Sequence, residues 1–228
     1  MSASGLIQGQ IPKLVARTRL SETSEAIRRV ILDGTLPSGA RVKDQEIALM
    51  LGVSRPTVRE AMRQLVHEGL LRHEPYKGLT VATLDDETVV QLAEVRAALE
   101  TLGAQRVALT MDESVRNELR KALDDLERCL TTSDIAGVNE AHIAFHRMIM
   151  RLSGNMILVE SWTALELRAR LEMRIDLENR RDLDRLLRDH QATLDVMEAG
   201  DPARIAEHFA VHVKDNARDV VRVRRSRG

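Results

Sequence analysis

The sequence contains very few aromatic side chains and a single cysteine. Phe, Trp and Tyr together make up 2% of the 228 residues. This favours aliphatic helix packing over an aromatic-rich sheet or a surface that stacks nucleic acid bases. One cysteine, Cys129, can form neither an internal disulfide nor a thiolate metal cage. We therefore expect a mainly α-helical protein in which Cys129 is a small helix residue.

The sequence also lacks a long apolar run. No stretch approaches the roughly 20 apolar residues that a membrane span requires, and the first residues, MSASGLIQGQ, lack the apolar core of a secretory signal. We therefore expect a soluble, cytoplasmic protein without a membrane partner. The chain has no Gly-rich phosphate loop and no nucleophile motif, which weighs against an enzyme.

The net charge of −1 conceals an uneven distribution of charge along the chain. The first 83 residues contain 12 Lys or Arg and 8 Asp or Glu, whereas the remainder contains 22 and 27. The N-terminal third is therefore the part better suited to a polyanion. An excess of four positive charges is a weak indication when taken alone.

The N-terminal third reads as a basic arm followed by two short helices. Residues 1–19 show no sustained period and predict a flexible arm. Apolar spacing predicts a helix over residues 21–33, and a second helix over residues 44–51 that Gly52 ends. The segment Thr35 to Gly39 between them has the residues of a turn.

A third helix and a hairpin follow. Ser54 is a suitable N-cap because its hydroxyl can accept a backbone N–H from the first turn, and Pro56 sits where a missing N–H costs little. The early, solvent-facing part of this helix carries Ser54, Arg55, Thr57 and Arg59. The pattern after Gly69 predicts a small hairpin with a basic tip.

The rest of the chain predicts helices only. Helical periodicity alternates with short breakers, and no fixed repeat is present. The six expected helices span residues 86–109, 112–132, 134–152, 155–178, 181–199 and 202–224. The fold class is therefore mainly α: an N-terminal winged helix-turn-helix and a C-terminal all-α bundle.

Residue chemistry on the third helix suits DNA. Arg55 and Arg59 are four residues apart, hence on one helical face, and each guanidinium can donate a bidentate pair to a guanine or a phosphate. The hydroxyls of Ser54 and Thr57 can contact phosphate, and Lys77 at the hairpin tip supplies another cation. The alternative is that both arginines are solvated or pair with Glu60 and its neighbours.

The run from Leu51 to Leu65, LGVSRPTVREAMRQL, resembles the winged-helix motif of GntR-type transcription regulators. The segment Leu36 to Val42 and the later Glu68-Gly69-Leu70 share this resemblance, which covers about residues 20–83. It implies that Arg55 and Arg59 contact double-stranded operator DNA, supported by Ser54 and Lys77. Some relatives carry a basic residue where this chain has Gln45. The resemblance therefore does not decide whether this position contacts a phosphate or a base.

Two histidines stand out in the C-terminal part. His142 and His146 lie one helical turn apart on the same face, and such a pair can chelate one ion. Zincin proteases use a similar pair but carry a Glu directly after the first His as the base, where this chain has Ile143. A hydrolase therefore lacks its base here.

Residues from about 88 to 220 resemble the FCD effector domain of the FadR subgroup. The resemblance implies a divalent metal site formed by His142, His146, His190 and His212. The family pattern has Asp where this chain has His142. This exchange favours zinc, nickel or copper over manganese or magnesium, or abolishes binding. His208, one turn before His212, is an alternative ligand or a residue that lines the pocket.

The resemblance also suggests how an effector binds. An incomplete metal shell would leave positions for the carboxylate of a small effector, and Arg96 would pair with that effector. The alternative for Arg96 is a helix pair with Glu100, four residues further on.

These observations predict a homodimeric, effector-responsive regulator, with a repressor favoured over an activator. The expected units are the arm at 1–19, the DNA-binding domain at 20–83 and the effector-binding and dimerisation domain at 84–228. The alternatives are a regulator that senses metal directly and a helical metalloenzyme that uses the four histidines.

Overall fold

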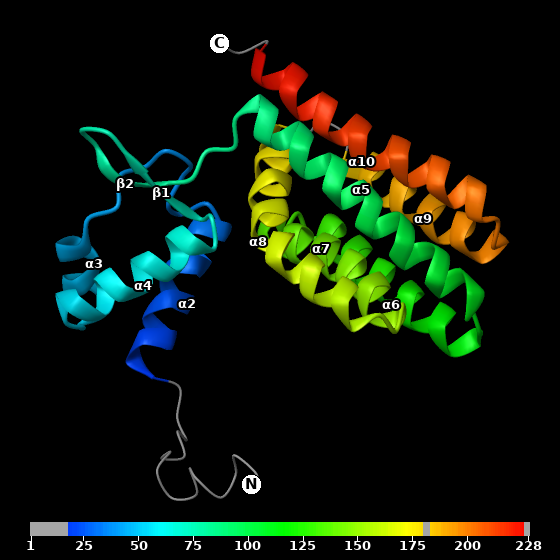
Figure 1. Ribbon diagram of the computed structural model, residues 1–228, viewed down its shortest axis with the longest axis horizontal. Coiled ribbons are helices and arrows are strands. Elements are labelled where there is room, and N and C mark those ends of the chain that lie inside the picture. The colour runs from blue at the N-terminus through cyan, green and yellow to red at the C-terminus, as the bar shows by residue number, and fades with distance from the viewer. Residues whose placement is uncertain (1–17, 180–182, 226–228) are drawn as a thin grey trace, which may run out of the picture.

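The computed structural model describes residues 18–179 and 183–225 and shows a small N-terminal unit beside a helical bundle (Figure 1). The N-terminal unit, here called the head, contains three helices and a hairpin: α2 (Arg19–Leu32), α3 (Asp44–Leu51), α4 (Arg55–His67), β1 (Leu71–Glu74) and β2 (Gly78–Val81). The bundle contains α5 (Asp86–Leu109), α6 (Glu113–Thr131), α7 (Ile135–Leu152), α8 (Met156–Asn179), α9 (Leu183–Ala199) and α10 (Pro202–Arg225). The predicted fold class is confirmed.

Local sequence signals set the ends of the head helices. Ser54 caps α4, and its Oγ accepts the backbone N–H of Thr57 at 3.3 Å. Gly52 ends α3 in the left-handed conformation with φ of 63°, which costs glycine little. The helix α2 begins at Arg19, so the arm predicted for 1–19 extends one residue too far. Its first 17 residues lie outside the described part of the chain.

The hairpin is an antiparallel pair in which Leu71 lies opposite Val81 and Glu74 opposite Gly78. Its turn places Tyr76 and Gly78 at φ of 65° and 82°. The inner face of the hairpin joins the buried faces of α2 and α4 in one apolar cluster, which includes Ile31, Leu65 and Leu71. This packing fixes the hairpin against the third helix of the head.

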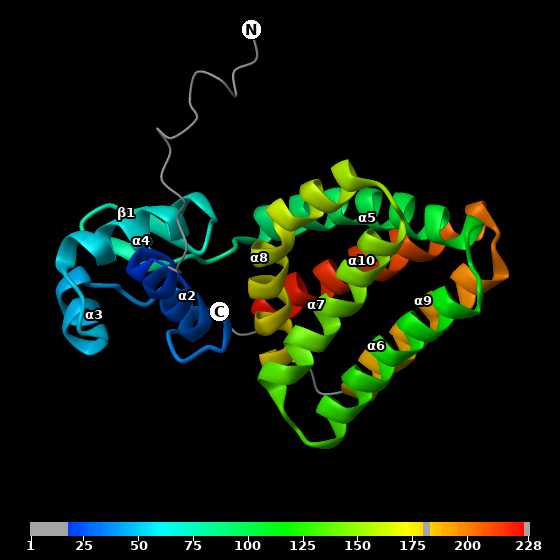
Figure 2. The same cartoon turned by 90° about the horizontal axis from the view of Figure 1, so that it is seen from below.

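The bundle has its own core. Figures 1 and 2 show α5 and α10 side by side, and α7 packs against both α6 and α8. Its largest fully buried side chains include Phe145, Trp162 and Phe209. Within the described residues, no helix is long and apolar enough to cross a membrane.

Helix α8 belongs to the bundle and also packs against the head. Leu167 packs against the apolar cluster of the head. Arg168 lies so close to Gly69 that a Cβ added there would meet its Nε at 2.6 Å. Gly69 also has φ of 79°, a conformation that favours glycine. Helix α8 therefore touches both units.

Candidate functional site

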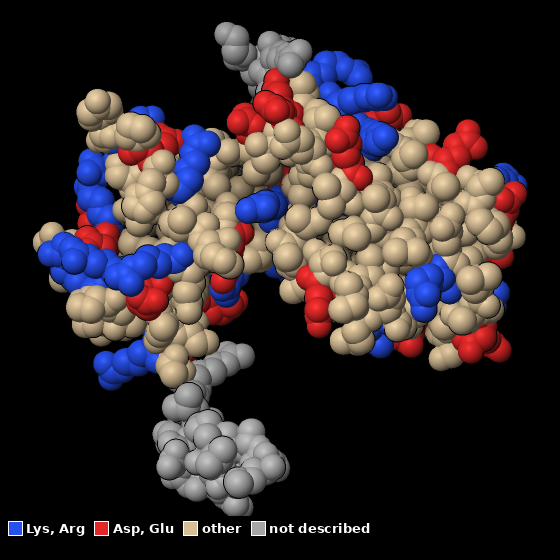
Figure 3. Space-filling view, viewed as in Figure 1, with Lys and Arg blue, Asp and Glu red and all other residues tan. Residues whose placement is uncertain are grey.

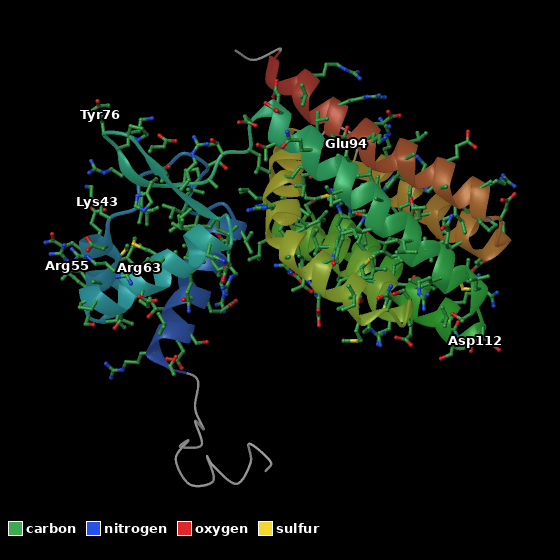
Figure 4. All side chains as sticks on the ribbon, viewed as in Figure 1. Lys43, Arg55, Arg63, Tyr76, Glu94 and Asp112 are labelled. Carbon is green, nitrogen blue, oxygen red and sulfur yellow. The ribbon has the colours of Figure 1, made fainter. Side chains whose placement is uncertain are left out.

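The predicted DNA-contacting residues lie together at the exposed start of α4. The side chains of Arg55 and Arg59 are 50% and 58% exposed, and the hydroxyls of Ser54 and Thr57 are 2.8 Å apart beside them. Figure 4 shows Arg55 and Lys43 extending outward from the head, and Figure 3 shows Lys and Arg gathered over its outer edge. This end of the head presents donors and positive charge to solvent.

Both arginines bind the same carboxylate. Arg55 Nη2 lies 3.1 Å from Asp44 Oδ2, and Arg59 Nε donates to the same oxygen at 2.6 Å. The hydrogen bond from Arg59 is the main cause that lowers the pKa of Asp44. Glu60, the partner considered from sequence, instead pairs with Arg63. The pairing of the arginines thus spans α3 and α4.

A hollow of about 580 Å³ lies between α3, α4 and the hairpin. Lys77 is at its edge and pairs with Glu74 at 3.1 Å, while its side chain stays 68% exposed. Gln45 also lines the hollow. The structure thus brings Lys77 and Arg59 to one concave surface, whose lining does not include Ser54, Arg55 or Thr57.

Three histidines meet in the interior of the bundle. His142 and His146 come from α7 and His190 from α9, and each is at most 1% exposed. His146 Nε2 lies 3.1 Å from Nε2 of His142 and 3.1 Å from Nε2 of His190. One ligand nitrogen from each ring lies within 4.8 Å of the other two. The fold therefore brings His146 and His190, which are 44 positions apart in the sequence, into direct contact.

Neighbouring acceptors favour particular protonated nitrogens in His190 and His146. His190 Nδ1 donates to the carbonyl oxygen of Leu186 at 2.7 Å, so in neutral His190 the Nε2 holds a lone pair. His146 Nδ1 lies 2.9 Å from Glu100 Oε2, which favours a proton on that nitrogen. Two Nε2 lone pairs then face each other at 3.1 Å, which is repulsive unless a cation lies between them.

The donor set fits a divalent metal. Imidazole nitrogens that share an ion at about 2.0–2.1 Å lie about 3.0–3.4 Å apart, close to the separations seen here. Desolvation by burial, followed by the charges of neighbouring histidines, lowers the pKa of His142 well below its usual value. A neutral imidazole is the form that binds a metal. Imidazole ligands suit zinc, copper, iron and nickel.

His212 and His208 lie at the side of this cluster. The His212 ring is 5.2 Å from that of His190 and 6.2 Å from that of His146, between centroids. Burial is also the first cause that lowers the pKa of His212. His208 stacks on His212 and its Nε2 lies 2.8 Å from Thr193 Oγ1. His212 therefore borders the three-histidine group, and His208 lies one step further out.

Arg96 is buried beside the cluster rather than presented to an open cavity. Its Nε donates to Glu100 at 3.1 Å and its Nη1 to Glu172 on α8 at 3.2 Å. The guanidinium also lies over the ring of Trp162, 5.7 Å from the centroid. The helix pair with Glu100, the simpler of the two sequence interpretations, is thus present.

Sequence reasoning missed two acidic residues of these sites, Asp44 and Glu172, and the contact of a third, Glu100, with His146. Asp44 precedes the motif helix, Glu172 lies 76 positions from Arg96, and Glu100 was considered only as a helix partner. The four-residue spacing of Arg96 and Glu100 was an available signal. Spacing alone could not bring Glu172 or Asp44 to their partners.

Comparison with known proteins identifies both units. The family described as "Bacterial regulatory proteins, gntR family" matches residues 20–81, and the "FCD domain" matches residues 91–215. The "Probable D-xylose utilization operon transcriptional repressor" of Paenarthrobacter nicotinovorans is 32% identical over 88% of this chain and 87% of its own. The "Gluconate operon transcriptional repressor" of Bacillus subtilis is 27% identical over 83% and 79%.

A solved structure has the same arrangement. The crystal structure of a GntR transcriptional regulator from Rhodococcus sp. RHA1 is 26% identical. It covers 89% of this chain and 97% of its own, with a TM-score of 0.78. Both the head and the bundle therefore have counterparts in one experimentally determined structure.

Proposed function

Because the chain belongs to the gntR family of bacterial regulatory proteins and carries an FCD domain, we propose that it represses transcription from operator DNA under the control of a small carboxylate effector. The observation that carries the effector part is the convergence of His142, His146 and His190 inside the bundle. The family and its relatives are transcription regulators rather than enzymes.

The histidine cluster would hold a divalent metal, with zinc or nickel expected from the imidazole donors. His142, His146 and His190 supply ligand atoms, and His212 borders them as a fourth candidate. A bound ion would supply a Lewis-acidic position for an effector carboxylate. Glu100 orients His146, and Arg96 supplies positive charge beside the site.

DNA binding belongs to the head in this proposal. Arg55 and Arg59 enter the major groove, Ser54 and Thr57 contact phosphate, and Lys77 on the hairpin reaches the backbone. Two copies of the chain would double these contacts and match a palindromic operator. The unit at 20–83 would therefore hold DNA, and the unit at 84–228 would bind the effector and the second copy.

Helix α8 offers a route between the two sites. Glu172 contacts Arg96 beside the histidines, and Leu167 packs on the core of the head five residues earlier. An effector that competes for Arg96 would release Glu172 and allow α8 to shift against the head. An effector that weakens DNA binding in this way must itself bind less tightly to the DNA-bound protein.

Burial favours a second candidate, a regulator that senses metal directly. The three histidines are at most 1% exposed, and Arg96 already contacts two carboxylates. An organic effector therefore has to displace protein groups, whereas an ion does not.

One titration separates the two candidates. Duplex fragments that the wild-type protein selects from genomic DNA are labelled, and binding is followed by fluorescence anisotropy. Zinc or nickel is added first, then gluconate, lactate or D-xylose, chosen because the names of the relatives include the gluconate, L-lactate dehydrogenase and D-xylose utilization operons. The effector proposal predicts that only a carboxylate weakens binding by the metal-loaded protein. If metal alone weakens DNA binding and a carboxylate has no further effect, the direct sensor is supported. A protein that selects no DNA fragment contradicts both candidates.

A further inference from the structure

Asp44 is an acidic residue on a surface that is otherwise mainly basic. Most charged residues that line the hollow between α3, α4 and the hairpin are cations: Arg41, Lys43, Arg59, Arg63 and Lys77. Among the described residues that line this hollow, Asp44 is the only acid. A carboxylate repels DNA phosphates, so its presence on a surface proposed to bind DNA requires another reason.

The contacts of Asp44 supply that reason. It accepts Arg59 Nε at 2.6 Å through Oδ2, and Arg55 Nη2 approaches both of its oxygens at 3.1 and 3.2 Å. The bond from Arg59 uses its Nε. Its Nη1 and Nη2 have no protein partner among the described residues, and they form the end of the guanidinium that suits guanine O6 and N7.

A role in helix capping does not explain this arrangement. Asp44 lies in the first turn of α3, where an acid is favoured by the helix dipole. Glu46 lies in the same turn and pairs with Lys43, without contacting either arginine. Stabilising the helix end therefore needs no bond to α4.

We infer that Asp44 is a positioning residue that sets operator specificity by holding Arg55 and Arg59 in the orientation that contacts bases. This inference rests on the proposed role of the two arginines in binding DNA. A held guanidinium loses less conformational entropy when it binds a base edge and has less freedom to reach any nearby phosphate. The negative charge of Asp44 also lowers affinity for DNA of any sequence.

Two variants separate the positioning of the arginines from the electrostatic repulsion of DNA. Asp44→Asn removes the charge and weakens the hold on the arginines. Glu46→Gln removes one charge from the same helical turn and leaves both arginine contacts in place. Each variant is titrated with the duplex that the wild-type protein selects from a random-sequence pool, and with a scrambled duplex of the same length. Arg59→Ala is measured alongside, and thermal unfolding is recorded for every variant.

We expect Glu46→Gln to raise affinity for both duplexes by the same factor. Asp44→Asn should raise affinity for the scrambled duplex similarly, but lower the ratio of selected to scrambled affinity about tenfold. Its unfolding temperature should match that of Glu46→Gln. A ratio in Asp44→Asn equal to that of Glu46→Gln, while Arg59→Ala loses its preference, overturns the role of Asp44 alone. A selected duplex bound equally well by Arg59→Ala overturns the proposed DNA surface as well.

Discussion

His146 and Glu100 form a fully buried pair, with Nδ1 and Oε2 separated by 2.9 Å. Desolvation by burial raises the pKa of Glu100, but its interactions with His146 and Arg96 outweigh this effect and lower the pKa to about 2. The carboxylate therefore stays ionised at physiological pH, and its negative charge favours a proton on His146 Nδ1, away from the histidine cluster. In metal sites such an outer carboxylate orients the ligand and raises its basicity.

Replacing Glu100 should weaken metal binding without removing a ligand. We expect Glu100→Gln to lower affinity for zinc or nickel by about 10–100-fold, because His146 loses its charged partner. Titration against a chromophoric chelator measures the effect. Glu94→Gln is the matched control, because Glu94 is an exposed acid of the same helix (Figure 4). Equal affinities in the two variants would argue against an orienting role for Glu100.

The elements of this fold were largely predictable from sequence, because their ends carry local signals. Ser54 and Gly52 mark the helices of the head, and periodicity located all six bundle helices to within one or two residues. The approach of His190 to His142 was not predictable from spacing, since the packing of α9 on the bundle decides it. It was expected only through resemblance to a family. The contact of Asp44 with α4 also depends on tertiary packing.

DNA affinity should depend strongly on salt. If each copy of a dimer neutralises three or four phosphates, log K should fall against log salt with a slope of about −5 to −7, from roughly −0.9 per phosphate. Fluorescence anisotropy with a labelled duplex at several potassium chloride concentrations measures this slope. A flat response would count against the basic surface of the head as the site of contact.

Removing Arg55 should reduce sequence discrimination. Arg55→Ala is expected to lower the preference for selected over random DNA by about 1–3 kcal/mol, because a bidentate contact to a base is lost. The comparison requires affinities for both duplexes. Arg128→Ala, an exposed arginine on α6, should leave both affinities unchanged. Equal losses of Arg55→Ala on both duplexes would instead identify a phosphate contact.

We expect Leu167 to transmit the effect of effector binding from the bundle to the head. Leu167→Ala removes the side chain of α8 that packs on the head. We expect the change in DNA affinity caused by the effector to shrink by about 0.5–2 kcal/mol. Metal affinity should stay unchanged. Leu165→Ala is the control, because Leu165 packs on the core of the bundle instead. A full effector response in Leu167→Ala would exclude this route.

The most direct test of the histidine site is the metal content of the protein purified without chelators. Inductively coupled plasma mass spectrometry would be applied to wild type, to His146→Ala and to His67→Ala, which removes an exposed histidine of the head. We predict about one zinc or nickel ion per chain in wild type and His67→Ala, and none in His146→Ala. A wild-type protein that is empty and binds neither zinc nor nickel when they are added would contradict a metal-dependent effector pocket.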